Sequence, residues 1–448
     1  MALDPQFAHD LLQRARTQGA TAGDVLMVDS TAFEVEVRLG EVDTVQHSHQ
    51  KRLGLRLFFG QRSATTSTSD LSEASLQRLL DDTCALAQAM EADPYSGLPD
   101  AEEIARAIPD LDLYDATLEQ VPVEDRTAMA RAAEQAALAY DSRITNSEGG
   151  SYRSSQGHII YASSHGFLGQ YRSSTVSLVV SPIAADTSGM QNDYWYSTGR
   201  KLANLQTPAA VGQEAARRAL RRLGARQVPT QKVPVVFDPS TAAALLGHLF
   251  SAISGSAIYR GASFLLDQLG QRIAPESVTV YDDGTLMGAL GSRPFDGEGL
   301  PTRRNTVVEG GVLHSYLLDT YTARKLGMRS TGNAARGVGD APSVSPTNFY
   351  LVPGTATPEE IIASVPQGLY VTSLIGFGVN QVTGDYSRGA AGMWIEGGEL
   401  AYPVEEITIA SNLRQMLANI EMIGNDLDMR RTITAPTLKI SEMTVAGA

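Results

Sequence analysis

Hydrophobic and polar positions alternate with a period of two in several short runs near the start of the chain. The runs, all between residues 24 and 60, are DVLMVDS, FEVEVRLG, VDTVQHSH and RLGLRLFFG. This pattern is typical of half-buried antiparallel strands. Helical patterns flank the runs, in Pro5–Thr17 and in the capped amphipathic stretch DLSEASLQRLLDDTCALAQAM. The pattern predicts an α+β domain over residues 1–93, followed by a linker rich in Pro, Gly and acidic residues.

A second segment, residues 111–227, places short strand patterns between two helical patterns. The first helical stretch, PVEDRTAMARAAEQAALAYD, is rich in alanine, and the second is TPAAVGQEAARRALRRLGA. Strands between two helices predict a further α+β domain. The arginines of ARRALRRLGARQ, from Arg217 to Arg226, have helical spacing and therefore predict a solvated helix face.

The third segment, residues 228–448, begins with a strand pattern and a helix that is apolar on nearly every side. This helix runs from Thr241 to near Gly255, and such a helix is buried in a large domain or a membrane. Its glycines, serines and His248 disfavour a membrane span. Strand patterns and Gly-rich turns fill the rest, with a hairpin expected at Gly310–Gly311. We predict a curled sheet or partial β-barrel around the buried helix.

Chain length, net charge and cysteine content limit the number of domains and the kinds of partner to expect. A chain of 448 residues needs more than one hydrophobic core, so the three segments are predicted to be three domains. The net charge of -14 disfavours a nucleic-acid partner, which requires a basic face. The single Cys84 excludes an internal disulfide and is expected to be a buried thiol. The N-terminus has an early aspartate and no apolar signal core, so we expect a cytoplasmic protein with no membrane association.

The buried helix lacks the chemistry of a metal site. A helical zinc site needs two ligands on adjacent turns and a carboxylate that activates water. His248 is the sole histidine of this helix, and four and five residues later stand Ala252 and Ile253. Ala243 and Ala244 precede it at the matching spacing. We therefore predict no metal site, and a core histidine hydrogen-bonded to a backbone carbonyl.

Two acidic clusters and a histidine pair leave alternatives open. Asp282–Asp283 and the pair Asp296 and Glu298 could hold calcium or perform acid–base chemistry. Both occur beside glycines, so turns are the favoured interpretation. His47 and His49 would lie on one side of a strand and could bind a metal, although a solvent-facing pair is simpler.

Two glycine-rich stretches supply candidates for a substrate cleft. STGNAARGVGD contains Arg336, and TGDYSRGAAG contains Asp385 and Arg388. Glycine-rich loops can cradle phosphate, but neither stretch has the ending of a nucleotide-binding loop, so tight turns or cleft-lining backbone are favoured. With His248, these residues form the candidate substrate-cleft set: His248, Arg336, Asp385 and Arg388. No catalytic residue is nominated.

The third segment resembles the TldD/PmbA family, once called modulators of DNA gyrase. The stretches that carry the resemblance are PFDGEGLPTRRNTVVEGGVLHSYLLDTYTARKLG, STGNAARG, PTNFYLVPG, VNQVTGDYSRGAAGMWIEGGELAYPVEEITIASN and APTLKISEMTVAG. In this family the TldD branch carries a helical HExxxH motif and a late cysteine as zinc ligands, and the PmbA branch, also called TldE, lacks them. Aligned backwards from Gly261, the ligand positions fall near Leu246, Gly247 and Ser251, and the wording LLGHLFSAISGSAIYRG resembles the PmbA branch.

The resemblance implies a subunit of a cytoplasmic TldD/TldE-type zinc metallopeptidase complex that acts on unfolded or flexible peptides. It implies a non-catalytic scaffolding chain with no cofactor of its own, zinc in the partner, a TldD-type homologous subunit as heterodimer partner, and a homodimer when alone. It also links the complex to peptide-antibiotic maturation and antitoxin turnover. The alternatives are a self-sufficient peptidase and a DNA gyrase-associated regulatory protein.

Overall fold

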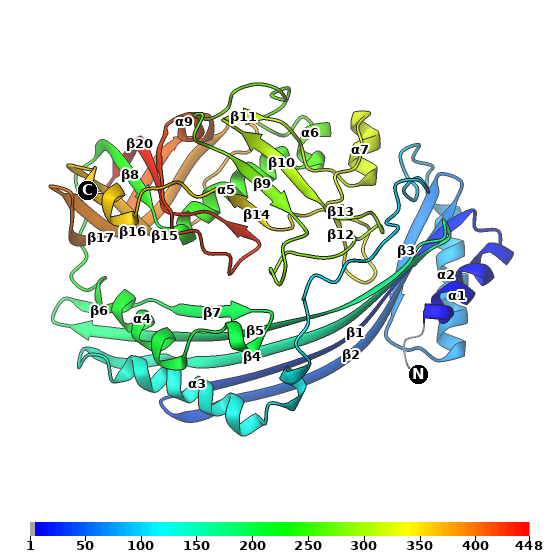
Figure 1. Cartoon of the computed structure of the whole chain (residues 1–448), viewed down its shortest axis with the longest axis horizontal. Helices are drawn as coiled ribbons and strands as arrows, with labels where there is room; N and C mark the ends of the chain where they lie inside the picture. The colour runs from blue at the N-terminus through cyan, green and yellow to red at the C-terminus, as the bar shows by residue number, and fades with distance from the viewer. Residues whose placement is uncertain (1–4, 448) are drawn as a thin grey trace.

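A computed structural model describes residues 5–447, and its N-terminal half is built on one long, curved antiparallel sheet (Figure 1). The strand order is β3-β2-β1-β4-β5-β6, and β7 also pairs with β5. The strands are β1 (Ala22–Arg38), β2 (Glu41–Phe59), β3 (Arg62–Thr68), β4 (Ile144–Ser163), β5 (Leu168–Asp186), β6 (Gly189–Asn192) and β7 (Trp195–Gly199). The strands predicted for the first two segments of the sequence therefore join a single sheet.

The prediction of four short strands before residue 60 was wrong in their number. DVLMVDS and FEVEVRLG lie on one strand, β1, and the next two runs lie on β2. The polar residues between the runs continue the ladder, because Thr31 pairs with His49 and Ser30 pairs with Gln50. Polar residues interrupt the hydrophobic pattern without interrupting the backbone hydrogen bonds.

The alternation along β1 decides what covers each face of the sheet. Val25 and Met27 belong to a core with α1 (Pro5–Thr17) and α2 (Glu73–Ala89), where Cys84 is buried as predicted. Phe33 and Val35 belong to a second core with α3 (Val123–Leu138) and α4 (Pro208–Leu220). Both helix pairs thus cover the face of the odd-numbered residues of β1.

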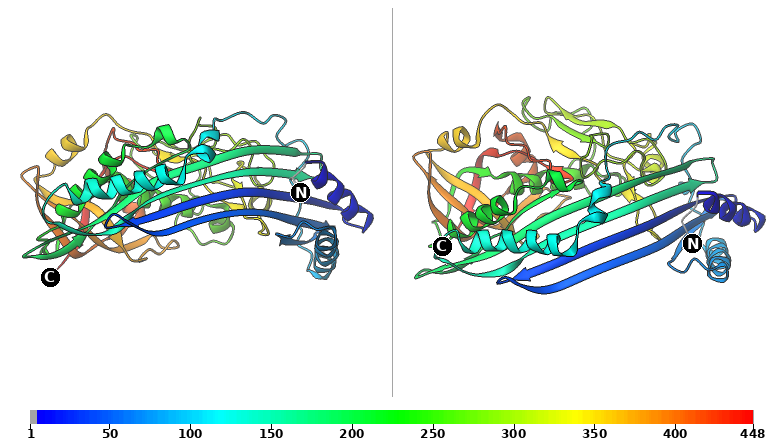
Figure 2. Two further views of the ribbon diagram at one scale, coloured as in Figure 1. Left: turned by 90° about the horizontal axis from the view of Figure 1, so that it is seen from below. Right: turned by 60° about the horizontal axis from the view of Figure 1, so that its bottom comes forward.

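The even-numbered side chains of β1 face the C-terminal half of the chain. Leu26 packs in a cluster with Phe295, which comes from that half. Gly54 of β2, which pairs with Leu26, lets the backbone of Gly339 approach, since a Cβ on Gly54 would lie 2.9 Å from the Gly339 nitrogen. Figure 2 shows the C-terminal half on one side of the curved sheet in two further views.

The C-terminal half contains a closed barrel, which extends the predicted curled sheet. Its strands follow the order β17-β16-β15-β8-β20, and β17 pairs with β20 to close the ring, while β18 (Ile420–Ile423) pairs with β20 outside it. The ring strands are β8 (Gln231–Phe237), β15 (Gln367–Ile375), β16 (Asp385–Glu396), β17 (Glu399–Asn412) and β20 (Leu438–Ala446). The α+β fold class is confirmed.

A second sheet has the order β11-β10-β9-β14-β19. Its strands are β9 (Val280–Asp283), β10 (Arg304–Glu309), β11 (Val312–Leu313), β14 (Phe349–Leu351) and β19 (Ile433–Thr434), and a small ribbon pairs β12 (Ala334–Ala335) with β13 (Ser343–Val344). Helix α5 (Pro239–Ile253) shares one hydrophobic core with this sheet and the barrel. The remaining helices are α6 (Gly255–Tyr259), α7 (Thr320–Leu326), α8 (Pro358–Ala363), α9 (Leu413–Ala418), and the 3-10 turns η1 (Ala116–Gln120) and η2 (Leu202–Asn204).

Candidate functional site

Helix α5 starts at a well-defined cap that connects it to the barrel. Asp238 directly follows β8, and its carboxylate accepts hydrogen bonds from the backbone N–H of Thr241 at 2.9 Å and from the Ser240 hydroxyl at 2.7 Å. Pro239 stands in the first turn, where its missing N–H costs nothing. The Thr241 hydroxyl also donates to the Val371 carbonyl of β15 at 3.1 Å. These bonds fix the direction of α5 against the barrel.

One side of α5 is open, although its sequence predicts burial all round. Ala244, Gly247, His248 and Ser251 are the residues that escape full burial on one face, at a spacing of three and four residues. A Cβ on Gly247 would meet only the Ile433 side chain, at 4.0 Å. Three of the four residues of the stripe are small, and apolar composition alone did not indicate that this side stays partly exposed. Of the three positions that the resemblance gave for zinc ligands, Gly247 and Ser251 lie on this stripe, whereas Leu246 is buried.

His248 projects from the stripe into a semi-polar environment. Its Nδ1 lies 3.5 Å from Nε2 of Gln381, and its ring packs edge-on against Tyr386 with centroids 5.9 Å apart. The predicted backbone carbonyl partner was wrong, because the polar neighbour of the ring is a side-chain amide. Burial, together with the charge of Arg388, lowers the pKa of His248 to about 4. His248 is therefore neutral at pH 7.

The structure brings three of the four predicted cleft residues together, around the loop of residues 376–384 between β15 and β16. Arg388 lies near His248 and Tyr386, and burial raises the pKa of Tyr386 to about 12 against the opposing effect of Arg388. Asp385 binds the Thr383 hydroxyl at 2.6 Å and the Asn412 amide at 3.2 Å, and these bonds lower its pKa. These hydrogen bonds of Asp385 therefore fix the end of the loop where it joins β16.

The fourth predicted residue, Arg336, lies elsewhere. Its side chain is only 3% exposed, and its Nη1 is 2.7 Å from Oδ1 of Asp24 on β1. Arg56 of β2 binds the other oxygen of Asp24, and Tyr161 of β4 donates to it at 3.2 Å. Arg336 therefore joins the C-terminal half to the sheet, and nothing in its surroundings connects it with the stripe on α5.

Sequence reasoning missed the most exposed apolar group beside the site. Phe377 is 101% exposed, and Val382 on the same loop and Ile375 at the end of β15 are 55% and 63% exposed. Gly376 has a positive φ of 80°, which lets the chain turn sharply before the phenyl ring. The available signal was a phenylalanine between two glycines in LIGFGVN. Exposed apolar side chains grouped on one loop mark a contact surface.

The acidic clusters have mainly structural partners. Asp296 accepts hydrogen bonds from the backbone N–H groups of Glu298 and Leu300, as the predicted turn requires. Asp283 accepts from the Thr285 N–H and hydroxyl in a second turn. Asp282 lies within β9 instead of a turn and binds Asn333 and Thr347. The turn interpretation is confirmed for Asp283 and Asp296 and was wrong for Asp282, which is fully buried within a strand between two neighbours.

The solvent-facing histidine pair is confirmed, since His47 and His49 are both exposed on β2, whereas the arginine run is only partly as predicted. His47 packs its ring against Phe33, with centroids 6.4 Å apart, and His49 binds Asp29 at 2.6 Å. The prediction of a wholly solvated arginine face was wrong, because Arg218 is 8% exposed. Arg218 lies between the sheet and the C-terminal half. Helical spacing indicates which side of a helix a residue occupies, but not what covers that side.

The residues on α5 do not fit a metal ion. Across residues 5–447, no group of three or more His, Cys, Asp and Glu side chains is arranged so as to hold one. A zinc ion needs three or four such donors. The open stripe offers His248 alone, beside Gln381 and Ser251, so we derive no metal-dependent step for this chain. None of the described helices is long and apolar enough to cross a membrane.

Comparison with known proteins identifies the family. The three PmbA/TldA metallopeptidase family models match residues 23–87 (domain 1), 116–223 (central domain) and 230–447 (C-terminal domain). The chain is 40% identical to Metalloprotease PmbA of Escherichia coli O157:H7 over 97% of this chain and 94% of that protein. It belongs to the PmbA/TldD family. A PmbA homologue of Haemophilus influenzae is 38% identical over 98% of this chain and 95% of its own length.

Solved structures of PmbA/TldD proteins share the whole architecture. A protein described as a modulator of DNA gyrase, from Bacteroides thetaiotaomicron, superposes with a TM-score of 0.93 at 29% identity, covering 100% of both chains. TldE from Thermococcus kodakarensis shares the fold, with a TM-score of 0.88 at 20% identity over 98% of this chain and 99% of that one. A TldD homologue of Haemophilus influenzae is 25% identical over 88% of this chain and 86% of its own length. Both branches of the family are therefore related to this chain, and relatives carry the name metalloprotease.

Proposed function

We propose that this chain is the non-catalytic, PmbA/TldE-type subunit of a cytoplasmic zinc metallopeptidase complex that acts on unfolded or flexible peptides. A TldD-type homologue is its partner and supplies the zinc. The observation that carries the proposal is the open stripe of α5, which offers His248 alone as a metal-type donor, while the positions that the resemblance implies for zinc ligands hold Leu246, Gly247 and Ser251. Such a surface can border a substrate chamber, but it lacks the ligands to activate water.

The loop beside the stripe supports a role in contact with another molecule. Phe377, Ile375 and Val382 are all exposed. Contact of these apolar side chains with water is unfavourable in a free monomer, and a partner that covers them removes this unfavourable contact. His248 and Tyr386 are both neutral at pH 7, so Arg388 is the charged group of the neighbouring wall. An extended peptide bound along this wall would be held mainly by main-chain hydrogen bonds and apolar contacts.

The long sheet offers a second surface for a partner. Residues 41–52 of β2 pair with β1 on one side, whereas β3 begins its pairing only at Leu53. Within the described chain no strand covers the outer side of that stretch. An uncovered strand edge pairs readily with another chain. We expect this chain to self-associate when it is alone and to exchange into a heterodimer with the TldD-type subunit, because related surfaces would form the contact in both assemblies.

The decisive experiment is proteolysis of an unfolded peptide by each chain alone and by the two mixed. We expect cleavage in the mixture, its loss with a chelator, and its loss when the partner's zinc ligands are substituted. Elemental analysis of this chain alone should show no stoichiometric zinc. Chelator-insensitive cleavage by this chain alone would refute the scaffold role and favour a self-sufficient peptidase.

A further inference from the structure

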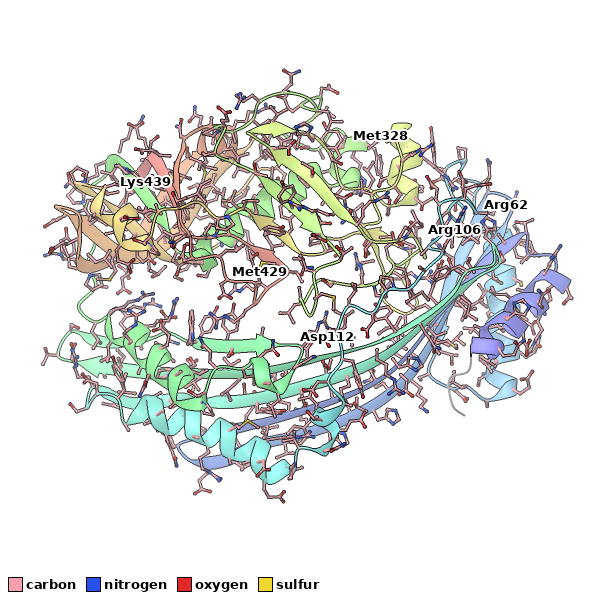
Figure 3. All side chains as sticks on the ribbon, in the orientation of Figure 1. Arg62, Arg106, Asp112, Met328, Met429 and Lys439 are labelled. Carbon is pink, nitrogen blue, oxygen red and sulfur yellow. The ribbon has the colours of Figure 1, made fainter. Side chains whose placement is uncertain are left out.

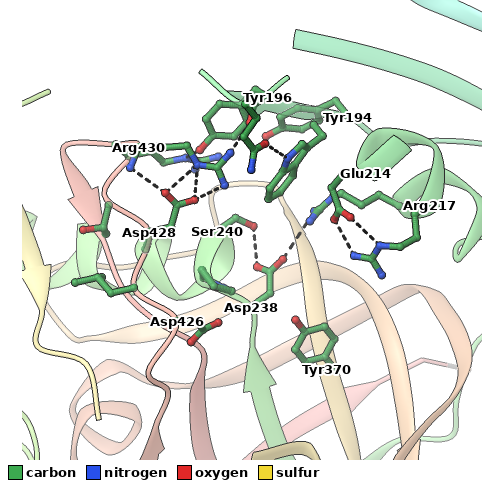
Figure 4. Close-up of a pocket in the computed structure, with 18 of the residues that line it drawn as sticks. Tyr194, Tyr196, Glu214, Arg217, Asp238, Ser240, Tyr370, Asp426, Asp428 and Arg430 are labelled. Atoms are coloured by element: carbon green, nitrogen blue, oxygen red, sulfur yellow. Dashed lines mark hydrogen bonds and ion pairs between the residues drawn. The ribbon is translucent and has the colours of Figure 1, made fainter. Parts of the chain in front are cut away.

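A cavity of about 520 Å³ lies between the sheet and the C-terminal half, away from the stripe on α5. Tyr194, Trp195 and Tyr196 line it from the sheet side, and Asp238 and Ser240 at the start of α5 line it from below (Figure 4). The loop of residues 426–434 closes one side, and Figure 3 marks this loop at Met429, where it approaches the sheet. Five arginines line the cavity: Arg217, Arg218, Arg221, Arg430 and Arg431.

The carboxylates of the cavity are already engaged. Glu214 binds Arg217 at 2.7 Å, and Asp428 binds Arg430 through both oxygens at 2.9 and 2.8 Å. The other two acids accept from backbone N–H and hydroxyl groups, and Asp238 also lies 3.8 Å from Arg218. The carboxylate of Asp426 accepts hydrogen bonds from the Thr437 N–H at 2.9 Å and from the Thr437 hydroxyl at 2.7 Å. Asp238 caps α5. These acids therefore leave part of the arginine charge without a counterion.

Arg221 and Arg431 carry that remaining charge. Across the described chain, neither has a carboxylate within ion-pair distance. Nε and Nη2 of Arg221 are buried without a hydrogen-bond partner, and Arg431 donates to the Tyr196 hydroxyl. Burial, and the charge of neighbouring Arg218, lower the pKa of Arg221. A guanidinium so placed gains strongly from an anion.

Several of these guanidinium groups stack on the faces of aromatic rings. Arg218 and Arg430 lie over the Trp195 ring, at 5.1 and 4.7 Å from its centroid. Arg431 lies over the Tyr196 ring at 5.2 Å. Stacking on an aromatic ring orients a guanidinium without neutralising it. The N–H groups of Arg430 already bind Asp428 and the Tyr196 carbonyl, so an oxyanion would be held by Arg431 and not by Arg430.

We propose that this cavity is a binding site for a small anion with a phosphate or carboxylate head group, held chiefly by Arg221 and Arg431. Its volume lies within the range of small-ligand pockets. Bound there, the anion joins the sheet half, through α4 and Tyr196, to the loop and the start of α5 in the other half. Asp238, which caps α5, lies 3.8 Å from Arg218 of the same cavity. The site thus connects ligand binding with the base of the helix that carries His248.

Titration calorimetry on the full chain tests this site. The probes are inorganic phosphate, N-acetylglycine as the carboxylate, and N-acetylglycinamide as its neutral counterpart, all at fixed ionic strength. We expect saturable binding of phosphate, of N-acetylglycine or of both, and none of the neutral amide. Which of the two anions binds more tightly identifies the head group.

Variants locate the binding within the cavity. Arg221→Gln and Arg431→Gln should each weaken anion binding by about tenfold or more, because each removes a charged donor. Arg222→Gln is the matched control, since Arg222 donates to the Asn192 carbonyl and does not line the cavity. It should keep affinity within about twofold. If Arg221→Gln fails to fold, Arg221→Lys keeps the charge, and its loss of the planar fork should still weaken binding.

Two results would overturn the proposal. One is the absence of saturable binding of either anion to the wild-type chain. The other is equal affinity in the wild type, Arg221→Gln and Arg431→Gln, which would place the anion elsewhere. Neither result bears on peptide cleavage in the mixed complex, so the site and the scaffold role are tested separately.

Discussion

His248 is a histidine whose surroundings remove its usual response to pH. Its pKa falls from the ordinary 6.5 to about 4 because the ring is partly buried and lies near Arg388. The folded state therefore binds fewer protons than the unfolded state between these two values. Stability from this group is fully present above pH 6.5 and is lost as the pH falls toward 4. We expect an NMR titration to show a neutral ring throughout the range from pH 5 to 8.

Replacement of His248 distinguishes a wall residue from a catalytic one. His248→Asn keeps a polar side chain near Gln381 and should leave peptide cleavage by the mixed complex within a few-fold of wild type. It should also reduce the loss of stability between pH 6.5 and 4, measured by denaturant melts. A fall in cleavage by orders of magnitude, with the fold intact, would contradict the proposed role.

Asp24 pairs with an arginine from each half of the chain. It is fully buried, and although burial opposes its ionisation, Arg336 and Arg56 hold its pKa below the usual value. Asp24→Asn leaves Arg336 without its counterion and leaves Arg56 with only Glu298, 3.8 Å away. We expect a loss of about 3–5 kcal/mol in the free energy of unfolding, from denaturant titration.

Asp29, on the same strand, provides the control for that substitution. It pairs with His49 and Lys51, and its side chain is 27% exposed. Asp29→Asn should cost less than about 1 kcal/mol, because water screens partly exposed pairs. Equal losses for the two variants would show that burial of the Asp24 network adds nothing to stability.

At the scale of elements, the β15–β16 loop separates stability from association. Phe377 is fully exposed, so Phe377→Ser should change the free energy of unfolding of the isolated chain by less than about 0.5 kcal/mol. The same change should weaken association with the TldD-type partner by about tenfold or more, because an apolar anchor is lost. Analytical ultracentrifugation or calorimetry measures this.

Met190 provides a matched control for the loop. It is 76% exposed and lies on β6, at the edge of the long sheet. Met190→Ser removes similar apolar surface, and association should stay within about twofold of wild type. If the two variants weaken association equally, the loop is not a specific contact.

At the scale of the whole molecule, a buried carboxyl between the two halves makes folding depend on pH. Burial raises the pKa of Glu298 from the ordinary 4.5 to about 7, although Arg56 acts in the opposite direction. Asp296 is shifted in the same direction by burial. The folded state then binds more protons than the unfolded state between pH 4.5 and 7. Stability from Glu298 is therefore present below pH 4.5 and lost as the pH rises through 7.

Glu298→Gln tests this dependence. The amide can still accept from the Thr320 N–H, which bonds to Glu298 at 2.9 Å in the wild type. We expect the decrease in unfolding free energy between pH 5 and 8 to become smaller in this variant. Glu309→Gln, at an exposed position on β10, should leave the wild-type profile unchanged. An identical profile for Glu298→Gln and wild type would contradict the assignment.

The sequence by itself determined the features that depend on neighbouring residues. Alternation predicted antiparallel strands near the start of the chain, and the apolar run from Thr241 to near Gly255 predicted helix α5, although its cap is Asp238. The missing ligands on the 241–255 helix were also visible, because metal ligands on a helix must occur at fixed spacing.

Only the tertiary structure decided which of these residues meet. His248, Asp385 and Arg388 gather at one loop, whereas Arg336 pairs with Asp24 more than three hundred positions earlier in the chain. The open stripe on α5 and the arginine cavity exist because two distant segments fail to fill a space between them. Burial and pairing between such segments depend on how the sheet curves under the C-terminal half, and this long-range geometry leaves no periodic pattern in the sequence.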